Sequence, residues 1–234
     1  MMVAKSEVEA TGTVLHDCPV LLPHQMSAYL YESNQPRFQT LFLNGQQDPT
    51  VLEAFWSGVV ERRDPRIRYH EMCTHPEWRR HAVPLSMHGD VVPCISIGCV
   101  GSKSFDVYSW QGLLSLGHTM AVKLYLFGLF EMNKVVEEGA STMTEIFRLC
   151  TWSLKALQSG LWPSHNHLGA PLHDSRAGIP LAGGYFGVLW SLKADLDHFP
   201  TAYGLHHYAS NQPCNFCHAY RCDVMGHALH TLPQ

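Results

Sequence analysis

The sequence predicts an α/β fold organised around a mixed β-sheet. Apolar residues alternate with other residues along two stretches, Val83–Asp90 and Phe186–Asp195, as they do on a half-buried pleated strand. Between them, Thr142–Ser159 repeats apolar residues at the spacing of an amphipathic helix. The chain has 234 residues, of which 46% are hydrophobic, so it is long enough and apolar enough to bury one sizeable core.

Residues 1–48 precede the first clear periodic pattern. Pro19, Pro23 and Pro36 interrupt the short apolar runs of this segment, so we expect a poorly defined N-terminal arm. The first residues lack the long apolar core of a secretory signal peptide. We therefore expect the folded domain to begin at residue 49.

The first helix is predicted from Thr50 to Arg63. Thr50 is placed to cap it, and Glu53 completes the pattern of a capping box. Asp64-Pro65 ends it, because a residue that precedes proline avoids the helical conformation.

Two further strands follow the first one, at Phe105–Trp110 and Val122–Phe130. The connections are short, which favours an antiparallel meander of three strands. The helix Thr142–Ser159 comes next, and Thr142 with Glu145 predicts a second capping box at its start.

A loop rich in Pro, Gly and His spans residues 162–184 and leads into the strand Phe186–Asp195, which a short helical piece, Asp197–Tyr203, follows. Three hairpin-linked strands, a helix and a fourth strand are the opening half of a ribonuclease H-like fold, in which strands one and four lie side by side. Other mixed sheets share this order, so the order alone leaves them open. We assign residues 49–203 to this incomplete domain and residues 204–234 to a Cys/His segment.

The charge distribution limits the partners. A net charge of -4 excludes a basic field over the whole protein, although a local basic patch stays open. Arginines gather between Arg62 and Arg80, but acidic residues are interleaved, so we interpret them as a solvated face rather than a phosphate site. The longest apolar run, Val122–Phe130, contains Lys123 and is too short to cross a bilayer. We expect an intracellular protein without membrane contact and with reduced cysteines, and leave homo-oligomerisation open.

Asp90 and Asp195 are the candidate catalytic residues and metal ligands, because each ends one of the two predicted strands. If the strand ends meet, their carboxylates are suited to Mg²⁺ or Mn²⁺, which prefer oxygen ligands and assist phosphodiester cleavage or transfer. Asp197 is a rival of Asp195, since either residue can be the ligand or a helix cap. The structural alternative is that Asp90 serves a Gly-Asp turn and Asp195 caps the following helix.

Cys214 and Cys217 form a C-x-x-C pair after Pro213, a spacing that suits tetrahedral Zn²⁺. His207 is the upstream candidate for a third ligand, and either Cys222 or His227 is available as the fourth. A redox dithiol and a pair of buried thiols are the rival interpretations.

A third set of polar residues lies in the loop, at His165, His167 and His173-Asp174. Two histidines separated by one residue chelate metal when they lie on a strand, but the surrounding Pro163 and Gly169 favour a loop. A His-rich metallohydrolase is therefore the weakest of the functional hypotheses.

The order of these motifs resembles that of DDE/D transposase-derived domains of the CACTA/Plavaka-like group. The similar segments, within roughly residues 80–222, are Pro84-Leu-Ser-Met-His-Gly-Asp90-Val-Val-Pro93, Leu189-Trp-Ser-Leu-Lys-Ala-Asp195 and Asn211-Gln-Pro-Cys-Asn-Phe-Cys217. The resemblance implies a ribonuclease H-like nuclease or strand transferase that acts on DNA, with Asp90 and Asp195 at the metal and a cysteine knuckle behind them. It also implies residence in the nucleus.

The chain departs from that family in one respect. Such a site takes a third acidic residue from a helix after a fifth strand, and no acidic residue follows Asp223 before Gln234. We therefore expect a truncated or degenerate transposase domain, in which efficient catalysis is in doubt. The alternative hypothesis is a non-catalytic module, stabilised by zinc, that binds nucleic acid or protein.

Overall fold

The structure is a computed structural model, and it describes residues 18–94, 103–130, 134, 136–137, 140–195, 198–207, 209–210, 219–220 and 230–231. Its helices are α1 (Pro23–Ser33), α2 (Gln35–Phe42), α3 (Thr50–Glu61), α4 (Trp78–His81), α5 (Thr119–Val122), α6 (Thr142–Ser159) and α7 (His198–Tyr203), with 3-10 turns η1 (Pro65–Ile67), η2 (Glu71–Thr74) and η4 (Ala182–Gly184). Its strands are β1 (Ala82–Cys94), β2 (Lys103–Gly112), β3 (Leu124–Phe130), β4 (Val136–Glu137), β5 (Ala140–Ser141), β6 (Phe186–Lys193), β7 (Ala219–Tyr220) and β8 (His230–Thr231).

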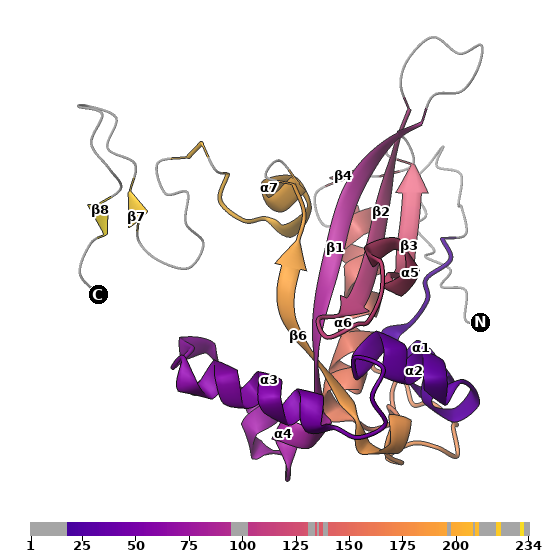
Figure 1. The fold of residues 1–234 in the computed structure, drawn as a ribbon. Helices are drawn as coiled ribbons and strands as arrows, with labels where there is room; N and C mark the ends of the chain where they lie inside the picture. Colours follow the sequence, from indigo (N-terminus) through magenta and orange to yellow (C-terminus); the bar gives the residue numbers. More distant parts are fainter. Residues whose placement is uncertain are drawn as a thin grey trace.

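The main sheet of the described residues has four strands in the order β3-β2-β1-β6 (Figure 1). β1, β2 and β3 form an antiparallel meander, and β6 returns after α6 to lie parallel to β1. The predicted α/β class with a mixed sheet is confirmed. The predicted adjacency of the first and fourth strands is present as well.

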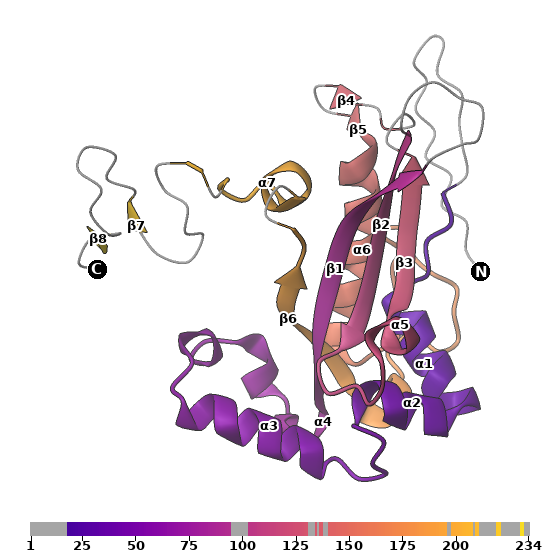
Figure 2. The same ribbon diagram turned by 45° about the horizontal axis from the view of Figure 1, so that its top comes forward.

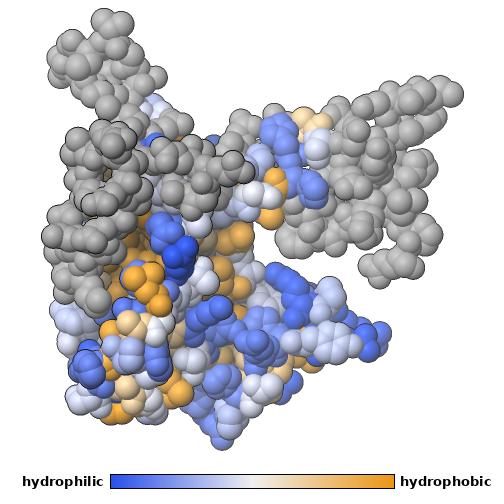
Figure 3. All heavy atoms as spheres, turned by 180° about the vertical axis from the view of Figure 1, so that it is seen from behind, coloured by the Kyte–Doolittle hydropathy of each residue, from blue (hydrophilic) through white to orange (hydrophobic). Residues whose placement is uncertain are grey.

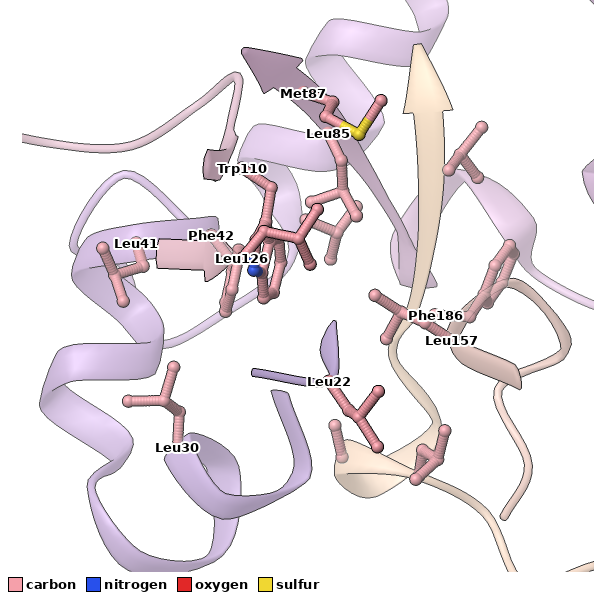
Figure 4. Packing of buried hydrophobic residues seen from close by; sticks show 14 of the residues in the cluster. Leu22, Leu30, Leu41, Phe42, Leu85, Met87, Trp110, Leu126, Leu157 and Phe186 are labelled. Carbon is pink, nitrogen blue, oxygen red and sulfur yellow. The ribbon is translucent and has the colours of Figure 1, made fainter. Parts of the chain in front are cut away.

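Helices cover one face of this sheet. α6 lies behind the strands and packs on β6, α1 packs on α6, and α2 contacts β2 and α1 (Figure 2). Leu157 of α6 approaches β6 at Gly187, where an added Cβ would lie 2.8 Å from the leucine side chain. Phe42 of α2 stacks on Trp110 of β2, with ring centroids 5.7 Å apart. Side chains from helices and strands thus converge on one hydrophobic core (Figure 4).

The N-terminal part differs from the expected arm, because residues 23–42 form two helices of that core. Both helices carry a proline in their first turn, where the missing N–H has no helical partner to lose. Asn34 caps α2 by accepting a hydrogen bond from the Arg37 N–H at 3.2 Å. The prolines and Asn34 therefore start helices here, and Phe38 and Leu41 are buried against the sheet. Residues 1–17 lie outside the described part.

Two predicted capping boxes are wrong, although the helices themselves are present. α3 has Pro49 as its N-cap residue, and Asp48 accepts the Thr50 N–H at 3.0 Å. α6 starts one residue after Ser141, and neither its N-cap nor that of α3 makes a side-chain cap hydrogen bond. In both helices the N-cap is the residue before the predicted one, Pro49 in place of Thr50 and Ser141 in place of Thr142.

α3 and α4 lie near the start of β1 and β6, at the lower left of Figure 1. The indole N–H of Trp56 donates to the Ala82 carbonyl at 2.7 Å and fixes α3 to the first residue of β1. Arg66 stacks over Trp190 of β6 at 4.1 Å and is bonded to Asp64. Arg80 pairs with Glu53 at 3.1 Å. These pairings agree with a solvated, mixed-charge face.

Candidate site at the ends of β1 and β6

Asp90 lies inside a strand and not at its end. The expected Gly-Asp turn is wrong, because β1 continues to Cys94 and Asp90 is paired with Val107 of β2. The carboxylate is exposed, and it makes no hydrogen bond or ion pair with the other described residues. Pairing with the antiparallel strand β2 extends β1 past Asp90. The alternation of apolar residues in β1 does not reveal this pairing.

Asp195 follows the end of β6 and caps α7. Its Oδ1 accepts a hydrogen bond from the His198 N–H at 2.6 Å. The residue is exposed, and its Oδ2 has no hydrogen bond within the described part of the chain. The capping alternative for Asp195 is thus present in the structure. It leaves one carboxylate oxygen available to a cation.

The two aspartates follow the same pair of neighbouring parallel strands, although only Asp90 lies within its strand. His88 and Lys193 are the last residues paired between β1 and β6, and each aspartate follows two positions later. Adjacent strands lie about 4.8 Å apart. The pairing therefore brings together two chain segments that are far apart in the sequence.

Gly89 decides how close α7 approaches β1. A Cβ at this position would lie 2.9 Å from the Tyr108 ring and would overlap the imidazole of His198. His198 is 4% exposed, and its ring centroid lies 5.5 Å from that of Tyr108. Since side chains alternate along a strand, Asp90 points to the face opposite Gly89. The helix that Asp195 caps therefore packs on the Gly89 face of β1, opposite to the face on which Asp90 lies.

The charges that act on His88 include both cations and the carboxylate of Asp90. Burial lowers the pKa of His88, and the neighbouring ammonium groups of Lys123 and Lys193 lower that pKa further. The carboxylate of Asp90 opposes them by favouring the imidazolium form. The charge around His88 is therefore mixed, with two lysines opposed by one carboxylate.

The predicted zinc ligands are only partly within the described residues. Cys214 and Cys217 lie outside them, as does Asp197, the rival of Asp195. His207 is exposed, and its Nδ1 accepts a hydrogen bond from the Ala209 N–H at 3.0 Å. Among the described residues, no group of three or more His, Cys, Asp or Glu side chains is placed to hold a metal ion. The zinc site stays a prediction.

The His-rich loop has a structural role in the described fold. The carbonyl of His165 accepts a hydrogen bond from the indole N–H of Trp152 at 2.8 Å, which ties the loop to α6. Asp174 pairs with Arg176 at 2.8 Å, and this pairing lowers the carboxyl pKa to about 2.

The sequence analysis did not predict two buried polar pairs. His24 of α1 is 1% exposed, and its Nδ1 lies 2.8 Å from the hydroxyl of Ser153 in α6. Burial, with a smaller contribution from Arg176, lowers the pKa of His24 to about 4. Asp106 of β2 is 2% exposed and forms an ion pair with Lys134. No short-range pattern signals either pair, because the partners lie on different elements.

Three comparisons of the chain with known proteins found no match. No family model matches it, and neither the curated proteins nor the solved structures contain a significant match. In the part of the chain that the structure describes, no helix is both long enough and apolar enough to cross a membrane.

Proposed function

We propose that this chain carries a transposase-derived nuclease domain with a ribonuclease H-like fold, in which Asp90 and Asp195 bind Mg²⁺ or Mn²⁺. The observation that carries the proposal is the parallel pairing of β1 and β6, because Asp90 and Asp195 each follow two positions after its last pair, His88 and Lys193. The order of the strands, with β6 beside β1, supports the fold.

The donor set fits a hard divalent cation. Both aspartates are exposed, the Asp90 carboxylate has no partner among the described residues, and Asp195 keeps Oδ2 after capping α7. Mg²⁺ is commonly held by one or two carboxylates and otherwise by water and substrate phosphate. Two aspartates that follow the last pair between β1 and β6 would therefore be a sufficient protein contribution.

The chemistry follows from the neighbouring charges. A bound cation would polarise a phosphodiester and lower the pKa of a coordinated water. The ammonium groups of Lys123 and Lys193, which act electrostatically on His88, would attract a DNA backbone to this end of β1. DNA is thus the proposed partner, and cleavage or strand transfer is the proposed reaction.

A second function is favoured by one specific observation. Asp195 already has a structural role, because its carboxylate accepts the hydrogen bond that caps α7. The alternative is a non-catalytic module that binds nucleic acid or protein and is stabilised by zinc at Cys214, Cys217 and His207.

A nicking assay separates the two functions. Supercoiled plasmid is incubated with the protein and Mn²⁺ or Mg²⁺, and wild type is compared with Asp90→Asn, which keeps the size of the side chain but removes its charge. The nuclease predicts nicking that needs the cation and is lost in the variant. Equal nicking by both proteins would exclude Asp90 as a ligand, and no nicking by wild type would favour the module.

A further inference from the structure

A groove with a volume of about 730 Å³ runs along α6, on the surface that the helix turns away from the sheet. Four of the lining residues form one stripe of the helix, namely Thr144, Arg148, Thr151 and Lys155. At 1.5 Å per residue the stripe is about 16 Å long. Figure 3 views the molecule from this side, where hydrophilic and hydrophobic side chains alternate over the surface.

The loop that follows α6 forms the second wall. His167 lines the groove, and its ring centroid lies 6.2 Å from that of Trp152. The hydrogen bond from the Trp152 indole to the His165 carbonyl holds this loop against the helix. Trp152 is half-buried, because one side of its ring meets His24. The loop wall is therefore held in place by Trp152, which itself contacts the buried His24.

The charged side chains that line the groove are all basic. Among the described residues, the ionisable side chains that line the groove are Arg148, Lys155 and His167, and none of the lining side chains is a carboxylate. Arg148 pairs with Glu145 at 2.9 Å, but both side chains are partly exposed, and such pairs contribute at most about 1 kcal/mol. Lys155 is exposed and has no ion pair among the described residues. Both cations are thus available to an anionic ligand.

The apolar part of the lining adds a second kind of contact. Phe147 packs its ring against Tyr108 and Phe127 in the core, and lines the groove beside Trp152. Cationic grooves with aromatic side chains bind single strands, because the cations follow the phosphates and the rings take the bases. The groove is also concave, which suits an unpaired strand better than a rigid duplex.

We propose that the α6 groove binds single-stranded DNA, with Arg148 and Lys155 on successive phosphates and a base against Trp152. The choice of DNA rests on the proposed function. The inferred affinity for a phosphodiester strand is independent of the proposed function, because it follows from the side chains that line the groove. The groove and the aspartate pair are separate sites, so each can be tested while the other is intact.

The experiment is fluorescence anisotropy with a labelled oligothymidylate in EDTA, which excludes metal-dependent cleavage. Arg148→Gln/Lys155→Gln is compared with Arg62→Gln/Arg68→Gln, which removes the same charge from exposed residues near α3. Losing two phosphate contacts should weaken binding about 25-fold at about 0.1 M salt and reduce the salt slope by about 1.4. The control should change binding less than about twofold.

Several results would overturn the proposal. They are no binding by wild type, equal weakening in both variants, tighter binding of an oligouridylate, and tighter binding of an acidic peptide. Asp90→Asn should bind oligothymidylate as wild type does, so loss of nicking in that variant leaves the groove intact. A thermal melt of each variant confirms that the fold is unchanged.

Discussion

His88 of β1 lies opposite Lys193 of β6, and this is the last parallel pair between the two strands. The relationship matters because Asp90 and Asp195 each follow two positions later, one inside its strand and one beyond its strand. A parallel pairing needs a crossover, and α6 supplies it. The helix and the aspartate pair are therefore consequences of a single topology.

Two substitutions of Asp195 should separate its role as the cap of α7 from its proposed role as a metal ligand. Asp195→Asn keeps an oxygen that caps α7, so its stability should stay near that of wild type, while Asp195→Ala should lose about 1 kcal/mol. Both variants lose the negative charge, so both should lose Mn²⁺ affinity in calorimetry. Urea denaturation measures the stability difference. Unchanged Mn²⁺ affinity in both variants would leave Asp195 with the cap alone.

Gly89→Ala should displace α7. The new methyl group would overlap the His198 ring, and overpacking of this kind destabilises by about 1–3 kcal/mol. The control is Gly58→Ala in α3, where the nearest atom is 3.4 Å away on the flexible Arg62 side chain. That change should stabilise by up to about 1 kcal/mol through helix propensity. Urea denaturation of both variants checks the opposite signs, and a stable Gly89→Ala would refute this packing.

His24 should make the protein sensitive to mild acid. Its pKa is about 4 in the folded state and 6.5 in the unfolded state, so the unfolded chain binds the proton first as the pH falls. The stabilisation is complete above pH 6.5 and declines until about pH 4, by about 3 kcal/mol in total.

The test of this pH dependence is urea denaturation at pH 7.5 and 4.5. His24→Gln cannot titrate and should be less sensitive to pH than wild type. Asp174 does not interfere, because its pKa of about 2 lies below the window. An equal pH dependence in wild type and variant would show that His24 does not control it.

The sequence predicted the elements whose pattern is local. Thr142–Ser159 coincides with α6, since its apolar stripe and Gly160 mark the helix directly. The alternation along Phe186–Asp195 located β6, which ends two residues earlier at Lys193. The class of the fold followed from the order of these elements.

Features that depend on distant partners could not be predicted. The extension of β1 past Asp90 depends on β2, and the pairing of His24 with Ser153 joins residues 129 positions apart. The N-terminal helices were missed because Pro23 and Pro36 were read as breaks, although proline also starts helices. For Asp195, the sequence predicted capping of the following helix as the alternative to a metal ligand, and the structure contains that cap at His198.

The most direct test of the proposed metal site is anomalous diffraction from a crystal of the protein soaked in Mn²⁺. The account predicts an anomalous peak that contacts carboxylate oxygens of both Asp90 and Asp195, at about 2 Å from each. It also predicts that the peak is absent in Asp90→Asn. Carboxylates more than about 10 Å apart, or directed to opposite faces of the sheet with no peak between them, would contradict it.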